Sequence, residues 1–222
     1  MAVTQITGRR LNEYAADYVV FDLETTGISA EEDLIIEISA IKVKEHKPVE
    51  EFSTLVNPGT HIPIGATNIN GITDDMVKDA PGLKTVLTDF LSFAGENILV
   101  GHNIQSFDLL FLYKAAEELL RRDVPNDYVD TLYMARLCLP QLPRYRLTDI
   151  SAYFNIETEG AHRALNDCLM NQQCYEKMGA LLGGQKEEIC PKCGGVLRKR
   201  SGKFGDFYGC SNYPVCRFTR NV

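Results

Sequence analysis

Two carboxylates interrupt a strand-like run near the start of the chain, and this arrangement restricts the fold more than any other feature. Residues 18–21 are apolar or aromatic, as in a strand that is covered on both faces. Asp22 and Glu24 follow, with Leu23 between them. Residues two apart on a strand point to the same side, so both carboxylates leave the end of a core strand together. Like charges this close repel each other, and burial adds to the cost, so the fold must supply compensation.

The first part of the chain alternates strand-like and helix-like segments. Strands are expected at three segments joined by short links, 18–24, 34–43 and 51–56. The short links favour an antiparallel meander. Residues 57–73 are rich in turn residues, and Thr73 should cap a short helix. Further helices and one short strand are expected at 83–95, 97–103 (strand), 106–122, 147–155 and 162–182. This order predicts an α/β fold with a mixed sheet flanked by helices.

The charge divides the chain into two modules. Residues 185–222 hold eight basic and three acidic residues, so this tail carries a charge of +5. Because the whole chain has a net charge of −7, residues 1–184 carry −12. We expect a catalytic-sized domain at 1–182 with its core at 16–180, a linker at 183–188 and a small module at 189–222. The sequence has no apolar run long enough for a membrane span, and its first ten residues lack the apolar stretch of a secretory signal. A cytoplasmic, reducing setting is therefore expected.

Three distant residues can join the first two acids. Asp108 falls in the first turn of its expected helix, where the helix N-terminus favours an ionised carboxylate. His162 and Asp167 are five residues apart, so they converge only if His162 precedes the helix and Asp167 lies one turn inside it. A histidine so placed stays neutral and can act as a base. Taken singly, these residues also fit a helix dipole, a surface histidine and an ordinary helical acid.

Four carboxylates in one place require positive charge between them. Hard divalent cations with oxygen ligands, Mg²⁺ or Mn²⁺, supply it, and two such ions suit phosphodiester cleavage. A neutral histidine would deprotonate the attacking water.

Three motifs together resemble a known superfamily. They are D-x-E-T-T-G at 22–27, H-N-x-x-x-F-D at 102–108 and H-x-A-x-x-D at 162–167. In this order and spacing they resemble the DEDDh 3′–5′ exonucleases, which include the proofreading subunit of bacterial replicative DNA polymerase. The resemblance covers residues 16–180 and implies a ribonuclease H-like fold.

The resemblance also implies roles for these residues. Asp22, Glu24 and Asp167 would bind the metal that activates water, Asp22 and Asp108 would bind the second metal, and His162 would be the general base. Candidate contacts to the substrate in this domain are Thr25, Thr26, Gly27, Asn103 and Phe107. Each of these also has a structural explanation as a turn, cap or core residue.

Four of the seven cysteines stand in the tail, at Cys190, Cys193, Cys210 and Cys216. Four thiolates so grouped suit a closed tetrahedral Zn²⁺ site, which would supply most of the folding energy of so short a module. Residues 188–219 resemble the C-terminal zinc fingers of type IA DNA topoisomerases, and this resemblance implies binding of single-stranded nucleic acid. Lys203, Phe204, Phe207 and Tyr208 are the candidate contacts, because bases stack on aromatic rings and cations meet phosphates. Packing of rings around zinc, or docking to a protein, are the alternatives.

The sequence therefore predicts a metal-dependent 3′–5′ exonuclease on single-stranded DNA, with a zinc finger that tethers the strand. A DNA polymerase or repair protein is an expected partner. An exoribonuclease is the alternative, and a non-catalytic nucleic-acid-binding protein is a third interpretation.

Overall fold

The computed structural model describes residues 7–157, 163–182, 190–202 and 205–221. Its main sheet has five strands in the order β3-β2-β1-β4-β5. These strands are β1 (Tyr18–Thr25), β2 (Ile35–Lys44), β3 (Lys47–Leu55), β4 (Ile98–Gly101) and β5 (Tyr128–Asp130). The first three form the expected antiparallel meander, and β4 and β5 run parallel to β1. The predicted mixed sheet is confirmed.

The helices agree with the sequence pattern in most places. They are α1 (Ile64–Asn70), α2 (Asp74–Val77), α3 (Leu83–Ala94), α4 (Asp108–Ala115), α5 (Thr131–Cys138), α6 (Leu147–Tyr153) and α7 (Ala164–Leu182). A π-helix, Ala116–Leu120, continues α4. The helix expected at 106–122 ends at Leu120, because Arg121 adopts a left-handed φ of 52°. The N–H of Arg122 then donates a hydrogen bond to the carbonyl of Ala116.

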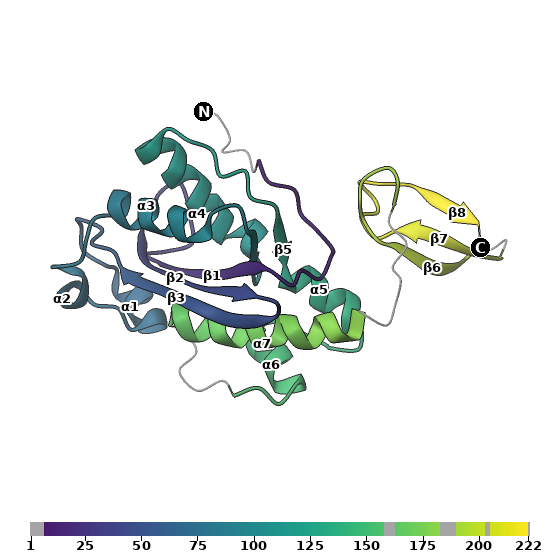
Figure 1. The fold of residues 1–222 in the computed structure, drawn as a ribbon. Coiled ribbons are helices and arrows are strands. Elements are labelled where there is room, and N and C mark those ends of the chain that lie inside the picture. The colour runs from purple at the N-terminus through teal and green to yellow at the C-terminus, as the bar shows by residue number, and fades with distance from the viewer. Residues whose placement is uncertain (1–6, 158–162, 183–189, 203–204, 222) are drawn as a thin grey trace.

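Both faces of the sheet are covered, as Figure 1 shows. Val19, Phe21 and Leu23 of β1 pack in one apolar cluster with α3 and α4. Tyr18 and Val20 belong to a second cluster, which includes residues of α5, α6 and α7. Because side chains alternate along a strand, the even-numbered side chains of β1 face the α7 side. This alternation places the two acids that follow Val20 on the same side as α7.

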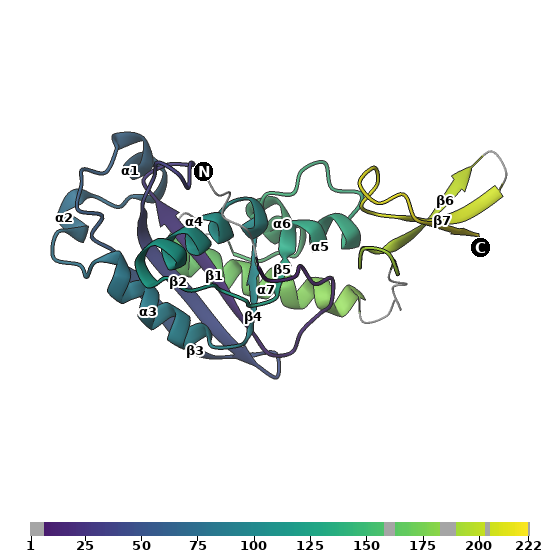
Figure 2. The same ribbon diagram turned by 90° about the horizontal axis from the view of Figure 1, so that it is seen from above.

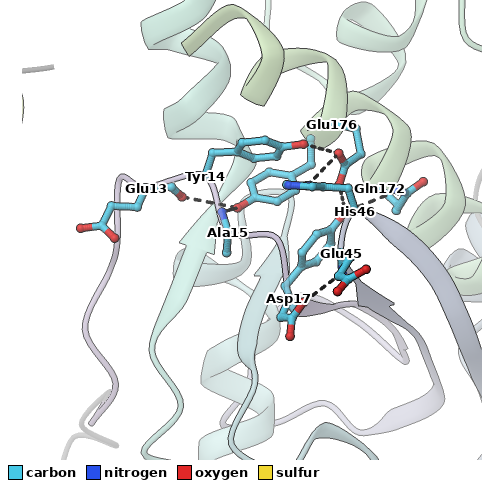
Figure 3. A network of polar contacts seen from close by, with 10 residues as sticks. Glu13, Tyr14, Ala15, Asp17, Glu45, His46, Gln172 and Glu176 are labelled. Atoms are coloured by element: carbon cyan, nitrogen blue, oxygen red, sulfur yellow. Dashed lines mark hydrogen bonds and ion pairs between the residues drawn. The ribbon is translucent and has the colours of Figure 1, made fainter. Parts of the chain in front are cut away.

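A half-buried carboxylate ties the N-terminal segment to this helix. Glu176 of α7 accepts a hydrogen bond from the hydroxyl of Tyr18 at 2.7 Å and another from the hydroxyl of Tyr14. His46, in the turn between β2 and β3, lies 3.3 Å from the same carboxylate and stacks on the ring of Tyr14. Figure 3 shows that these side chains come from three segments distant in sequence. One carboxylate on α7 therefore fixes the helix against the end of the sheet farther from Asp22.

The C-terminal residues form a separate three-stranded antiparallel sheet in the order β6-β7-β8. Its strands are β6 (Leu197–Gly202), β7 (Gly205–Cys210) and β8 (Thr219–Asn221). Figure 2 shows this sheet beyond the end of α5, apart from the main sheet. Asn12 donates to the carbonyl of Gly194 at 3.0 Å, and Arg10 donates to Asn212 at 3.3 Å. The expected linker at 183–188 lies outside the described residues. None of the described helices combines the length and apolarity needed to cross a bilayer.

Candidate nuclease site and zinc centre

Three of the predicted acids meet at the end of β1. Asp22, Glu24 and Asp167 each offer a carboxylate oxygen, and these oxygens lie within 4.8 Å of one another. The first two leave the α7 side of β1, and Asp167 comes from the first turn of α7. All three are partly exposed, so solvent and ligands reach them. Oxygen donors grouped this closely suit a hard divalent cation such as Mg²⁺ or Mn²⁺.

The charge on these acids is unfavourable without a cation. Burial raises the pKa of Glu24 to about 8, and the neighbouring carboxylates of Asp167 and Glu37 add to the rise. Burial also raises the pKa of Asp22 well above its ordinary value, with Asp108 and Asp167 contributing. The site therefore holds protons near neutral pH unless a metal ion replaces them.

Asp108 lies beside the three-acid group but turns toward the backbone. It is the first residue of α4 and is 2% exposed, and its Oδ1 accepts the N–H of Leu23 at 3.1 Å. The sequence suggested that the helix N-terminus would keep this acid ionised. Instead burial outweighs the N–H groups that it accepts and raises its pKa to about 7.

A fifth carboxylate, Glu37 of β2, was missed by sequence reasoning. It is paired in register with Glu24, so both side chains lie on the α7 side of the sheet. Glu37 is 3% exposed, and its Oε1 lies 3.3 Å from the guanidinium of Arg163. Within the described part of the chain its Oε2 has no hydrogen-bond partner. The apolar run around it, "LIIEISAIKV", resembles core strand, and only the β1–β2 register reveals its neighbour.

His162 lies outside the described residues, as do Lys203 and Phe204. The helix α7, which carries Asp167, begins at Ala164. The assignment of His162 as a base rests on the motif H-x-A-x-x-D.

Two of the three acids, Asp22 and Asp167, line an open cleft of about 800 Å³. Asn103, in a left-handed conformation with φ 62°, lines the same cleft. His102 also lines the cleft, and its Nε2–H donates to the carbonyl of Tyr145 at 2.9 Å. Burial lowers the pKa of His102 to about 4, so it is neutral and holds the loop that carries Tyr145.

The other candidate residues of the nuclease domain are engaged locally. The hydroxyl of Thr25 donates to the carbonyl of Gly27, and Thr26 bonds to Asp33 and to the N–H of Leu34. A Cβ at Gly27 would lie 2.4 Å from the carboxylate of Asp33, so a larger residue here would have to displace that side chain.

Phe107 packs against the core cluster beneath α4, and its ring lies 5.1 Å from that of Phe111. The turn and core explanations thus account for the positions of Thr25, Thr26, Gly27 and Phe107. Their contacts to substrate remain predictions.

The four tail cysteines converge as predicted. Their sulfur atoms lie within 4.8 Å of one another, with 3.8 Å between Cys190 and Cys216 and 3.3 Å between Cys193 and Cys210. A tetrahedral zinc ion with Zn–S bonds of about 2.3 Å separates its sulfurs by about 3.8 Å. The donor set and its spacing therefore fit zinc. The other cysteines serve packing, since Cys168 and Cys174 are buried on α7 and Cys138 is half-buried on α5.

The rings of the tail divide between two environments. Tyr208 and Phe218 pack against the cysteine cluster, as the packing alternative predicted. Phe207 instead lines a hollow of about 250 Å³ together with Tyr213, which is 62% exposed. Arg200 and Arg217 also line this hollow, so it combines aromatic and cationic groups.

Comparison with known proteins agrees with this geometry. Residues 19–175 match the family described as Exonuclease, and residues 187–222 match the family described as Topoisomerase DNA binding C4 zinc finger. DNA polymerase III subunit epsilon of Aquifex aeolicus is 37% identical over 161 residues, which are 72% of this chain and 79% of that protein. DNA polymerase III PolC-type of Bacillus subtilis is 44% identical over 153 residues, 68% of this chain and 10% of that protein. The chain thus spans only about a tenth of the PolC-type relatives.

Solved structures show the same fold. Exonuclease X in complex with 5′ overhanging duplex DNA aligns with a TM-score of 0.57 and 24% identity, over 80% of this chain and 97% of that chain. E. coli exonuclease I in complex with a dT13 oligonucleotide aligns with a TM-score of 0.65 and 18% sequence identity, over 91% of this chain and 54% of that chain. The ribonuclease H-like fold expected from the sequence is therefore confirmed. On the evidence of its matched residues and its relatives, the chain belongs to the exonuclease family and carries a C-terminal module similar to the topoisomerase zinc fingers.

Proposed function

We propose that this protein is a two-metal 3′–5′ exonuclease that acts on single-stranded DNA. The convergence of Asp22, Glu24 and Asp167, two of which line an open cleft, is the observation that carries the proposal. Burial and the neighbouring carboxylates raise the pKa values of Asp22 and Glu24, and a divalent cation makes their grouping favourable.

The residues divide between the two ions as the family resemblance implies. Asp22, Glu24 and Asp167 would hold one Mg²⁺ or Mn²⁺, and Asp22 with Asp108 would hold the second. When bound, such ions stabilise charge on the attacking and leaving oxygens. His162 takes a proton from the attacking water, and the water oxygen bonds to phosphorus. The bond from phosphorus to the 3′ oxygen breaks, and this oxygen takes up a proton from solvent. The products are a nucleoside 5′-monophosphate and a strand with a new 3′ hydroxyl.

The tail supports a second part of the proposal. A zinc ion on the four cysteines would stabilise the three-stranded sheet, and the hollow with Phe207 and Tyr213 offers rings for base stacking beside Arg200 and Arg217. We therefore assign this module, residues 189–222, to binding and tethering the strand. The four thiols must stay reduced to bind zinc, so we place the protein in the cytoplasm.

The choice of DNA rests on the relatives. Those named above are DNA polymerase III subunits, and the two solved structures hold DNA. By the same reasoning we propose a DNA polymerase or repair protein as partner. RNA cleavage is the competing outcome of the test.

The test uses single-stranded DNA and RNA of one sequence, each labelled at the 5′ end. The purified protein is incubated with each strand in Mg²⁺, in Mn²⁺ or in chelator. We expect a metal-dependent ladder of DNA products that shortens from the 3′ end, and little shortening of RNA. Asp22→Ala, Asp108→Ala or Asp167→Ala should each nearly abolish the ladder while the fold survives. Wild-type turnover by any of these variants would refute the assignment of the metal ligands. Faster degradation of RNA than of DNA would refute the assignment of DNA as the substrate.

A further inference from the structure

Three arginines line the cleft that also contains two of the site's acids. Arg136 at the end of α5, and Arg144 and Arg146 in the connection to α6, line the same cleft as Asp22 and Asp167. Residues 1–184 carry a net charge of −12, which by itself would repel a polynucleotide. The structure instead concentrates positive charge beside the metal site.

The loop that carries Arg144 and Arg146 is held in place by two hydrogen bonds of Tyr145. Tyr145 lies between the two loop arginines, its carbonyl accepts from His102 at 2.9 Å, and its hydroxyl donates to the carbonyl of Leu139 at 3.0 Å. The side chains of Arg144 and Arg146 are 67% and 65% exposed. The contacts of Tyr145 therefore position two exposed arginine side chains at the cleft.

Asp149 is the acid that pairs with Arg144 and Arg146, and one carboxylate leaves part of their positive charge unneutralised. Asp149 lies 2.9 Å from Arg146 and 3.7 Å from Arg144. Within the described ranges no ion pair engages Arg136, whose guanidinium lies 6.0 Å from the ring of Tyr145. One acid cannot neutralise three arginines, and exposed pairs of this kind contribute at most about 1 kcal/mol. Capping of α6 by the pair of Arg146 with Asp149 explains one arginine and leaves the others unexplained.

We propose that Arg136, Arg144 and Arg146 form a phosphate-binding ridge that holds the DNA backbone on the 5′ side of the scissile nucleotide. The inference rests on the proposed function, because it assumes that a 3′ end occupies the acids. Guanidinium groups pair with phosphate oxygens irrespective of base, so the ridge confers grip without sequence preference. It makes the nuclease domain itself, in addition to the zinc module, a binding surface for the strand.

The experiment compares two substrates with the full-length protein. One is single-stranded DNA, and the other is the p-nitrophenyl ester of thymidine 5′-monophosphate, which has one phosphodiester and no phosphate upstream. For Arg144→Ala/Arg146→Ala we expect kcat/KM on DNA to fall about tenfold more than kcat/KM on the ester. The slope of log kcat/KM against log salt should flatten by about 1.4, or about 0.7 for each lost contact to a single strand. Arg144→Lys/Arg146→Lys keeps the charge and should retain the wild-type slope.

Arg122→Ala, which removes an exposed arginine at the end of the π-helix, is the matched control and should keep the wild-type slope. Equal kinetics of the double alanine variant and the wild type on DNA, or equal losses on both substrates, would overturn the ridge. Hydrolysis of neither substrate by the wild type would instead refute the proposed function. The two failures are therefore distinguishable.

Discussion

Metal should stabilise this protein more at pH 8 than at pH 5. Glu24 has an ordinary pKa of 4.5, which burial and neighbouring carboxylates raise to about 8 in the metal-free fold. A carboxyl group whose pKa is higher in the folded state stabilises the fold at low pH. That contribution is lost as the pH rises from about 4.5 through about 8. For Glu24 alone the loss between pH 5 and pH 8 is about 3 kcal/mol.

A bound divalent cation offsets this loss because it interacts with the ionised carboxylates. At a metal concentration about 100 times the dissociation constant, binding adds about 2.7 kcal/mol to the free energy of unfolding. For a chain of this size that raises the melting temperature by roughly 5–10 °C. The quantity to measure is the melting temperature in saturating Mg²⁺ or Mn²⁺ minus that in chelator, at each pH from 5 to 8. Taking the difference cancels carboxylates outside the site.

Two variants make the measurement specific. Asp22→Asn removes a proposed ligand and keeps the shape, so the rise with metal should shrink. Asp89→Asn changes an exposed acid on α3 and should leave the rise unchanged. A metal-induced rise that is absent, constant between pH 5 and pH 8, or undiminished in Asp22→Asn would refute the reasoning.

Three further predictions concern other parts of the molecule. The charge of Glu37 raises the pKa of Glu24, and Glu37→Gln removes this charge. The acidic limb of the pH profile of kcat/KM, measured at saturating Mg²⁺, should therefore move to lower pH. An acidic limb at the wild-type pH would contradict this prediction. Glu176→Ala leaves two tyrosine hydroxyls without their acceptor and should lower the free energy of unfolding in urea by about 1–3 kcal/mol. The control Glu118→Ala, at an exposed position, should change it by no more than about 0.5 kcal/mol. Equal losses in the two variants would show that the network around Glu176 does not stabilise the fold. Deleting residues 185–222 should raise KM on long single strands more than it lowers kcat, and unchanged kinetics would rule out the tether.

The sequence predicted those parts of the fold that depend on local pattern. The β1–β3 meander, α3, α6 and α7 follow from apolar periodicity, and the motif spacing identified the acids now seen together. The segments α1 and β5–α5 were missed. The first includes turn-forming residues in "IPIGATNIN", and β5 has only three residues, too few for a periodic signal.

The rest of the site depends on contacts between distant segments. Glu37 joins the acids only through the β1–β2 register, which no local pattern specifies. The arginines at 144 and 146 flank a tyrosine whose anchor is His102, more than 40 residues earlier in the chain. The same limit applies to Asp108, whose burial outweighs the stabilisation expected from its helix terminus.

Anomalous X-ray scattering from crystals grown with Mn²⁺ tests the central claim most directly. The account predicts a manganese peak between Asp22, Glu24 and Asp167, and a zinc peak enclosed by the four tail cysteines. The manganese peak should vanish in Asp167→Ala while the zinc peak stays. Saturating Mn²⁺ with no peak at the three acids, in crystals that show the zinc peak, would contradict the claim that these carboxylates form a metal site.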